Sequence, residues 1–470
     1  MPRQIADPNP DRTMQAVWDV ARSFGLDPFP THFEIVPAAM VYEFGAYGIP
    51  GRFSHWTHGK AFYHMKTMYD YGLSKIYELV INANPSQAFL LDTNDALENK
   101  MVMAHVLGHT DFFKNNLYFA DTNRKMPESV SVNADRIARY EFEHGLLAVE
   151  RFLDAALSLK EHIARQPDNA VSRNPAAKDE ESGAVGTPYE DVLSIGVARP
   201  EAKAEDRVKK IPERPEHDLL YFLIAYARDL EDWQRDILAV VREEMIYFLP
   251  QMRTKIINEG WASYWHYRIM DALDLPADEY ASFSRMHSGV VSPGGRMHIN
   301  PYYVGFKVLE DIERRWDNPT DEEQQQLGRV PGQGRAKLFE VRETESDQTL
   351  LRKYLTEELV RDLDLYTYKL VDDEWQVADT NWRTVRDTLV AGLDNFGLPV
   401  IVVADGDYRN NRELYLEHRY EGTELDIRYA EKTLQHVFFI WNRTVHLETL
   451  IDGKKVRLTY DGKRNSKTVV

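Results

Sequence analysis

Two histidines, His105 and His109, are four residues apart in the segment AHVLGHTDFFKNN. If this segment is helical, both imidazoles project from one face about one turn apart, which allows two nitrogens to bind one zinc ion. The 15 histidines of the 470-residue chain would give about 0.5 such pairs by chance, so the spacing alone is a weak indication. The alternative is a pair of core histidines that hydrogen-bond to their surroundings.

The composition restricts which atoms can bind a metal. The chain contains no cysteine. This excludes disulfides, thiolate zinc sites, iron–sulfur clusters and cysteine nucleophiles. Any metal must therefore be bound by histidine, aspartate or glutamate, and zinc is the metal that a histidine pair favours.

Two other segments carry residues that could do chemistry. His55 and His58 have i, i+3 spacing in HWTHGK and could bind a second metal or line a cleft, but a loop histidine packed on an aromatic ring is the favoured interpretation. Residues 405–407, Asp-Gly-Asp, resemble a fragment of a calcium loop. They lack the spaced carboxylates and the final glutamate, so the sequence predicts a turn there.

Four aromatic residues follow closely in one predicted helix: Trp261, Tyr264, Trp265 and Tyr267. They could form a platform on which a sugar stacks, which would suit a peptidoglycan substrate. Aromatic residues at this density on one helix more often belong to the core, and we favour that interpretation.

The elements around His105 and His109 are a strand region followed by a helix. Short β-type runs at 75–82 and 88–91 are separated by Asn-Pro, and a helix is predicted to start near Asp95 with Thr93 or Asn94 as its cap. Further helices are predicted over 131–160, over a long or broken segment that ends at Pro250, and over the following residues to about 273.

The whole chain is predicted to be α+β and mainly helical, with a small C-terminal α+β domain. The segment from 165 to 217 is poor in aromatic residues and reads as a flexible acidic and polar insert. The predicted organisation is an N-terminal lobe (1–164), this insert, a helical lobe (218–364) and the C-terminal domain (365–470).

Charge and hydropathy limit the partners and the location. The net charge is −18 and no long lysine or arginine cluster is present, so we expect no direct contact with nucleic acid. The longest apolar runs fall far short of the roughly 20 residues that cross a bilayer, and the N-terminus has no secretory signal pattern. We therefore expect no transmembrane segment and a cytoplasmic location.

Six segments in order give the chain a resemblance to the SpoVR-like family (stage V sporulation protein R). They are HWTHGK (55–60), KIYELVINANP (75–85), AHVLGHTDFFKNN (104–116), REEMIYFLPQ (242–251), TKIINEGWASYWH (254–266) and INPYYVGFKVLEDI (299–312). The likeness covers nearly the whole chain outside the insert. It implies a part in formation of the spore cortex in spore-forming bacteria, with members also in bacteria that do not sporulate, and no established reaction.

A second, local resemblance concerns the metal site. A strand, a His-x-x-x-His helix and a later helix with Asn-Glu-Gly resemble the gluzincin metallopeptidases, and this implies a zincin-like core of a small sheet plus helices. In that likeness His105, His109 and Glu259 are the metal ligands. His266 lies seven residues after Glu259 on the same helical face, as a fourth ligand or a proton donor.

The resemblance fails at the position of the general base. The metallopeptidase motif His-Glu-x-x-His has its base where this chain has Val106, and valine cannot move a proton. The carboxylate must then come from elsewhere, and the candidates are Glu78, Asp111, Glu243 and Glu244, with Glu244 ranked first. Asp111 is about 240° around the helix from His105, so it is expected to orient a ligand or to pair with a basic residue.

Two functions remain in competition. The first is a zinc-dependent hydrolase that cleaves an amide bond in a cell-wall precursor or a regulatory protein. The second is a non-catalytic scaffold or regulator of cortex assembly that retains a zincin-like fold without the base.

Overall fold

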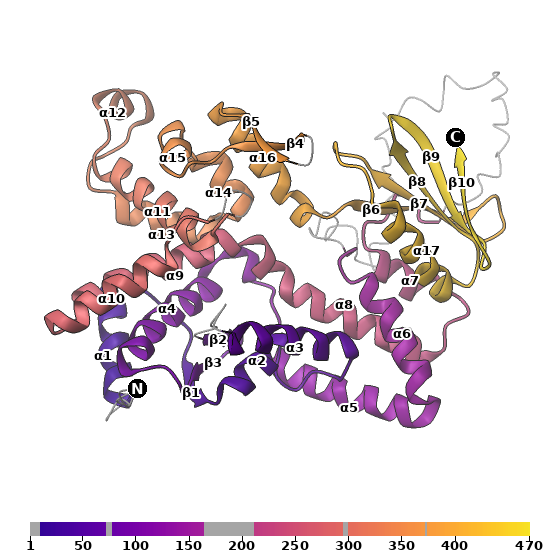
Figure 1. Cartoon of the computed structure of the whole chain (residues 1–470), viewed down its shortest axis with the longest axis horizontal. Helices are drawn as coiled ribbons and strands as arrows, with labels where there is room; N and C mark the ends of the chain where they lie inside the picture. Colours follow the sequence, from indigo (N-terminus) through magenta and orange to yellow (C-terminus); the bar gives the residue numbers. More distant parts are fainter. Residues whose placement is uncertain (1–9, 72–77, 164–210, 295–298, 372–373) are drawn as a thin grey trace, which may run out of the picture. The chain divides into compact units, whose positions relative to one another are not determined.

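The computed structural model describes residues 10–71, 78–163, 211–294, 299–371 and 374–470 (Figure 1). The chain forms two compact units, and each of them uses two stretches of sequence. The first unit comprises Met1–Leu153 and Val240–Leu398, and the second comprises Asp154–Ala239 and Pro399–Val470. Residues 165–210 of the predicted insert lie outside the described residues, and the predicted domain boundaries stay predictions. No helix within the described ranges is both long and apolar enough to cross a membrane.

The elements up to the start of the second unit alternate helices with short strands. They are α1 (Pro10–Ser23), β1 (Thr31–Val36), α2 (Ala38–Tyr47), α3 (Trp56–Asp70), β2 (Glu78–Ile81), β3 (Ser86–Leu91), α4 (Ala96–Asn115), η1 (Leu117–Phe119), α5 (Met126–His144) and α6 (Leu146–Ser158).

The chain then continues mainly as helices to the end of the first unit. These elements are α7 (Leu219–Tyr226), α8 (Asp232–Arg253), α9 (Lys255–Ala272), α10 (Ala277–Val290), α11 (Pro301–Asp317), α12 (Asp321–Leu327), α13 (Gly334–Thr344), α14 (Asp347–Tyr354), α15 (Glu357–Asp362), β4 (Thr367–Val371), β5 (Glu374–Asp379), α16 (Trp382–Leu393) and η3 (Asp394–Gly397). The prediction of a mainly helical α+β chain is confirmed.

A small sheet precedes the histidine helix, as the sequence predicted. Its strand order is β1-β3-β2, with β1 parallel and β2 antiparallel to β3. Because β2 is an edge strand, Glu78 at its start lies at the margin of the sheet. The following helix α4 begins where predicted, but its cap is Asp95, which forms a capping box with Glu98.

Three helices of the first unit pack closely because small residues meet at their crossings. A Cβ built on Gly260 of α9 would lie 2.4 Å from the carbonyl carbon of Gly305 in α11. Where α4 crosses α9, a Cβ built on Gly108 of α4 would lie 2.7 Å from the Cα of Ala262 in α9. Backbones at this separation leave no room for a side chain. The glycines therefore fix how α4 and α11 lie against α9.

We expect Gly260→Ala to destabilise the protein by roughly 1–3 kcal/mol, because the new methyl group forces α9 and α11 apart. A urea titration followed by circular dichroism measures this as a lower midpoint. Gly392→Ala in α16 is the matched control, since a Cβ there meets nothing within 4 Å. Equal midpoints for the two variants would contradict this account of the helix crossing.

Two helix predictions were wrong in detail. The single helix predicted over 131–160 is two helices, α5 and α6, because Gly145 between them has φ +91°. Phe142, near the end of α5, is 91% exposed. The helix predicted to end at Pro250 runs on to Arg253, since proline removes only one backbone hydrogen bond and Thr254 Oγ1 donates to the Pro250 carbonyl oxygen.

The second unit contains a five-stranded sheet with the order β10-β9-β8-β7-β6. The strands are β6 (Val400–Tyr408), β7 (Glu413–Arg419), β8 (Val445–Ile451), β9 (Lys454–Tyr460) and β10 (Asn465–Val469). The helix α17 (Ile427–Trp441) connects β7 to β8. The prediction of a small C-terminal sheet domain is confirmed. The turn predicted at 405–407 was wrong: these residues lie inside an irregular part of β6, where the Gly406 N–H donates to the Ile211 carbonyl.

Candidate metal centre

The two histidines of α4 lie next to each other and point the same way. Their ring centroids are 4.6 Å apart and both side chains are buried in the first unit. The helix is buried on nearly all sides at this point, including at Val106 between the two histidines. The predicted geometry of a histidine pair on one helical face is therefore present.

Glu259 reaches both histidines from α9, although it lies 150 positions after His109 in the sequence. Its Oε2 atom is 3.3 Å from His109 Nε2 and 3.6 Å from His105 Nε2. A tetrahedral zinc site with bonds of about 2.0–2.2 Å has ligand–ligand edges of about 3.3–3.6 Å. The Glu259 oxygen thus lies from each of the two imidazole nitrogens at the spacing that two ligands of such a site have.

The buried polar atoms at this point need a positive charge. Among the described residues, His105 Nε2 and Glu259 Oε2 have no hydrogen-bond partner. His109 Nδ1 lies 3.0 Å from Asn258 Oδ1, and since an amide oxygen accepts, Nδ1 of His109 donates. A neutral His109 then presents a lone pair on Nε2 to the Glu259 carboxylate. Such a contact requires a cation between the two atoms, which can be a proton or a metal ion, so the residues fit a metal.

The ionisation of the group follows from burial and from mutual charge. Burial alone would raise the pKa of Glu259, but the charges of His109 and His105 outweigh burial and hold that pKa well below its usual range. Burial opposes a charge on His109, yet Glu259 overcomes it and raises the pKa of His109. Glu259 is therefore a carboxylate, which is the form that binds a cation.

Glu78 of β2 is the second carboxylate of the site. Its carboxyl oxygen and the ligand nitrogens of His105 and His109 all lie within 4.8 Å of one another. Burial raises the pKa of Glu78, against the effect of the two histidines. The sequence had named Glu78 only as one of four candidate bases.

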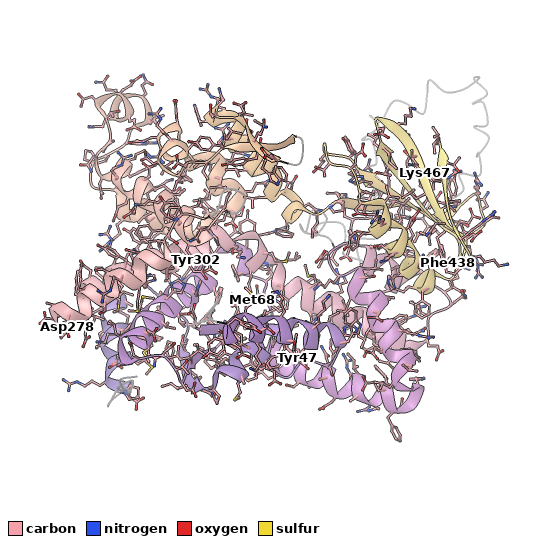
Figure 2. The ribbon with its side chains drawn as sticks, viewed as in Figure 1. Tyr47, Met68, Asp278, Tyr302, Phe438 and Lys467 are labelled. Carbon is pink, nitrogen blue, oxygen red and sulfur yellow. The ribbon has the colours of Figure 1, made fainter. Side chains whose placement is uncertain are left out.

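Tyr302 of α11, labelled in Figure 2, was not identified from the sequence. Its ring stacks on the His105 ring with centroids 5.9 Å apart and planes at 26°. Burial and the negative charge of Glu259 raise the pKa of Tyr302, so its hydroxyl keeps its proton. No short-range motif marks this residue, because it reaches the site from a third helix.

His266 lies behind His105 and contacts its far nitrogen. The two Nδ1 atoms are 2.9 Å apart, and Nε2 of His266 is 2.8 Å from Nδ1 of His287 in α10. Burial lowers the pKa of both His266 and His287, the latter to about 4, so both rings are neutral at pH 7. The sequence did not identify His287 as a site residue, because it does not lie one helical turn from another histidine of the site.

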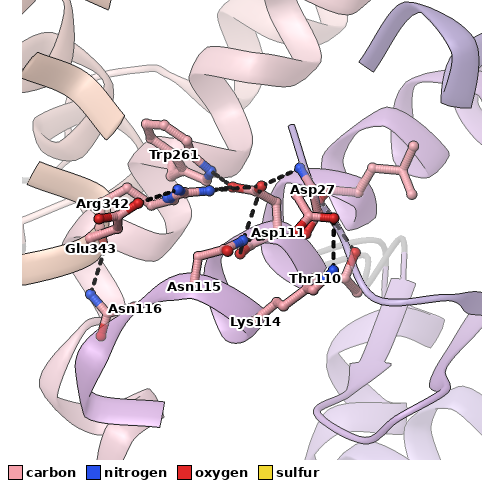
Figure 3. Close-up of polar contacts among 10 residues, drawn as sticks. Asp27, Thr110, Asp111, Lys114, Asn115, Asn116, Trp261, Arg342 and Glu343 are labelled. Carbon is pink, nitrogen blue, oxygen red and sulfur yellow. Dashed lines mark hydrogen bonds and ion pairs between the residues drawn. The ribbon is translucent and has the colours of Figure 1, made fainter. Parts of the chain in front are cut away.

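Asp111 pairs with a basic residue, one of the two roles expected for it (Figure 3). Its Oδ1 lies 2.9 Å from Arg342 Nη1, and it also accepts hydrogen bonds from the Asp27 backbone N–H and from Trp261 Nε1. These contacts join α4 to α9 and α13. Asp111 therefore sets the relative position of the two helices that carry His109 and Glu259.

The remaining candidates have other surroundings. Glu244 is buried and forms an ion pair with Arg52 at 2.5 Å, and Glu243 accepts a hydrogen bond from Asn123 at 3.4 Å. Whether Glu244 acts as a base stays a prediction. His55 caps α3 by accepting from the Thr57 N–H, in line with the favoured non-metal interpretation.

The aromatic residues of α9 belong to the core. Trp261, Tyr264 and Trp265 are each at most 2% exposed, so they offer no surface for a sugar to stack on. The core interpretation is confirmed for these three residues.

The chain is similar to known proteins over most of its length. Residues 9–398 match the family described as "SpoVR like protein", and residues 399–452 match the "SpoVR-like C-terminal domain". The boundary between the two matches coincides with the junction of the two units at Leu398 and Pro399. The chain is 29% identical to "Uncharacterized protein YcgB" of Escherichia coli (strain K12), over 93% of this chain and 91% of that protein. No solved structure matches the chain.

Proposed function

This chain belongs to the SpoVR family, whose membership suggests a role related to sporulation, and we propose that it acts in that role as a metal-dependent hydrolase of amide bonds. The ligands in this proposal are His105, His109 and Glu259. A zincin-like arrangement of the sheet, α4 and α9, a cytoplasmic location and the absence of nucleic-acid contacts are parts of the same proposal.

One observation carries the proposal: Glu259 Oε2 lies 3.3 Å from His109 Nε2 and 3.6 Å from His105 Nε2, and among the described residues neither this oxygen nor His105 Nε2 has a hydrogen-bond partner. Three protein ligands with an open fourth position are typical of catalytic zinc, whereas structural zinc sites are closed by four protein ligands. A zinc ion held there would supply a Lewis acid that polarises a carbonyl group.

The chain's own residues would do the proton chemistry. Val106 is fully buried and cannot be the base, so we assign this role to Glu78, whose carboxylate lies beside both histidines. Glu78 would accept the proton of the attacking water and pass it to the amine that leaves. Tyr302, next to Glu259 and His105, would hold the substrate carbonyl through its protonated hydroxyl.

The substrate class in this proposal is an amide bond of a cell-wall precursor or of a regulatory protein. The competing function is a scaffold or regulator of cortex assembly, and the observation in its favour is the valine at the place of the usual base. The two functions differ in whether the zinc-loaded protein turns over any amide substrate.

We expect Glu78→Gln to retain its metal but to lower the rate of amide hydrolysis at least about 100-fold, since general-base catalysis contributes 10²–10⁴-fold. Mixtures of peptides and of peptidoglycan fragments, incubated with the zinc-loaded protein and read by mass spectrometry, measure the rate. Glu34→Gln, at an exposed glutamate of β1, is the matched control. If the unaltered protein binds zinc and cleaves no component, the scaffold function replaces the hydrolase.

A further inference from the structure

Three histidine rings form one line of hydrogen bonds that begins at the metal site. The line runs from Nδ1 of His105 in α4 through both nitrogens of His266 in α9 to Nδ1 of His287 in α10, with N···N distances of 2.9 and 2.8 Å. His266 is 0% exposed. Both nitrogens of this buried ring therefore contact other imidazoles.

Such a line can point in only one direction at a time. Each N···N contact needs one proton, and a neutral imidazole has one N–H donor and one acceptor. The hydrogen-bond partners of His266 in the described part of the chain are both imidazoles, and a charge on this ring would lack a carboxylate to compensate it. A neutral His266 donates to one neighbour and accepts from the other. All donors in the line thus point toward His287, or all point toward His105.

The two directions differ in whether His105 Nε2, the atom that faces Glu259, carries a proton. A metal on His105 needs the lone pair of Nε2, so the proton of that ring must lie on Nδ1 and the line points toward His287. With the line reversed, Nε2 carries the proton and presents it to the Glu259 carboxylate, 3.6 Å away. We propose, building on the metal centre proposed above, that His266 and His287 are positioning residues that hold His105 in its metal-binding tautomer.

When the line changes from pointing toward His105 to pointing toward His287, the number of protons on the three rings stays the same. One proton leaves His105 Nε2, one passes from His266 Nδ1 to His105 Nδ1, and one passes from His287 Nδ1 to His266 Nε2. The fourth transfer is uptake of a proton from water by His287 Nε2. His287 can make this exchange because it keeps 8% of its surface exposed, whereas His266 keeps none.

The ring of His287 is held in place by aromatic neighbours. Its centroid lies 4.8 Å from that of Tyr267, 5.2 Å from Phe306 and 6.0 Å from Phe283. Rings packed on several sides cannot rotate freely, so Nδ1 of His287 stays directed at His266. Packing against these three rings thus fixes the end of the line.

Zinc affinity, measured by competition with a chromophoric chelator, tests the proposal. We expect His266→Phe to weaken zinc binding about 10–100-fold, because it removes the acceptor of His105 Nδ1–H. His266→Gln should restore much of the affinity, since its side-chain oxygen can accept the same proton. His287→Phe should fall between the wild type and His266→Phe, and His32→Gln, an exposed histidine of β1, should change nothing.

Nitrogen-15 spectra of histidine-labelled protein provide a readout that folding defects do not imitate. In the zinc-bound wild type, the proton of His287 should lie on Nε2, because Nδ1 of His287 then accepts the proton of His266 Nε2. A zinc-bound protein whose His287 carries its proton on Nδ1, or equal zinc affinity in His266→Phe, overturns the inference but leaves the metal centre intact. A wild type that binds neither zinc nor cobalt contradicts the proposed function itself. If His266→Phe does not fold, the wild-type spectra alone decide.

Discussion

Glu259→Gln is expected to lower zinc affinity by more than about 100-fold, because residues that only support a ligand already contribute 10–100-fold. The amide is nearly the same size as the carboxylate, so it keeps the packing between α4 and α9. It removes the negative charge that faces His105 and His109 at 3.6 and 3.3 Å. Competition with a chelator measures the affinity, and circular dichroism verifies that the variant is folded.

The matched control is Glu313→Gln in α11, a carboxylate that binds Arg268. It should leave zinc affinity unchanged. Retention of wild-type affinity by Glu259→Gln would show that this residue is no ligand and that the spacing of the three atoms is a coincidence of packing.

Asp111→Ala is expected to destabilise the protein by about 3–5 kcal/mol, the usual result of removing one partner of a buried ion pair. Asp111 is fully buried and Arg342 is 5% exposed, so the guanidinium would lose its buried partner and keep only Glu343, whose side chain is 56% exposed. Trp261 Nε1 and the Asp27 N–H would lose their acceptor as well. Urea denaturation measures the change in the free energy of unfolding.

An exposed ion pair between nearby segments provides the comparison. Lys114 Nζ lies 2.7 Å from Asp27 Oδ1, but the Asp27 side chain is 66% exposed. Lys114→Ala should therefore cost no more than about 1 kcal/mol. An Asp111→Ala variant as stable as Lys114→Ala would contradict the role of the Asp111 network in joining α4 to α9.

The sequence was informative wherever a signal is local. The start of the α4 helix near Asp95 was predicted from neighbouring residues that can cap a helix, and the one-turn spacing of His105 and His109 follows directly from helix geometry. The strand region before it was predicted from β-type runs on either side of an Asn-Pro turn. Glu259 was named because the order of segments resembles a known metallopeptidase arrangement, and no property of the residue itself marks it.

Residues that reach the site across helix crossings could not be predicted. His287 and Tyr302 contact His266 and His105 only because α10 and α11 pack beside α9, and the Gly260–Gly305 crossing sets that packing. Such crossings depend on which helix backbones can approach each other closely. Neither the periodicity nor the composition of the sequence predicts which helices will do so. The ion pair of Glu244 with Arg52 likewise joins segments far apart in the sequence, and no local signal indicates it.

The metal content of the purified protein tests the central claim most directly. Elemental analysis of the wild type, beside His105→Ala/His109→Ala, should find a stoichiometric transition metal in the wild type and almost none in the double variant. Both samples should have the same helical content, since the two side chains contribute to the site more than to the core. A wild type free of transition metal after zinc is supplied, or equal metal in both proteins, would contradict the account.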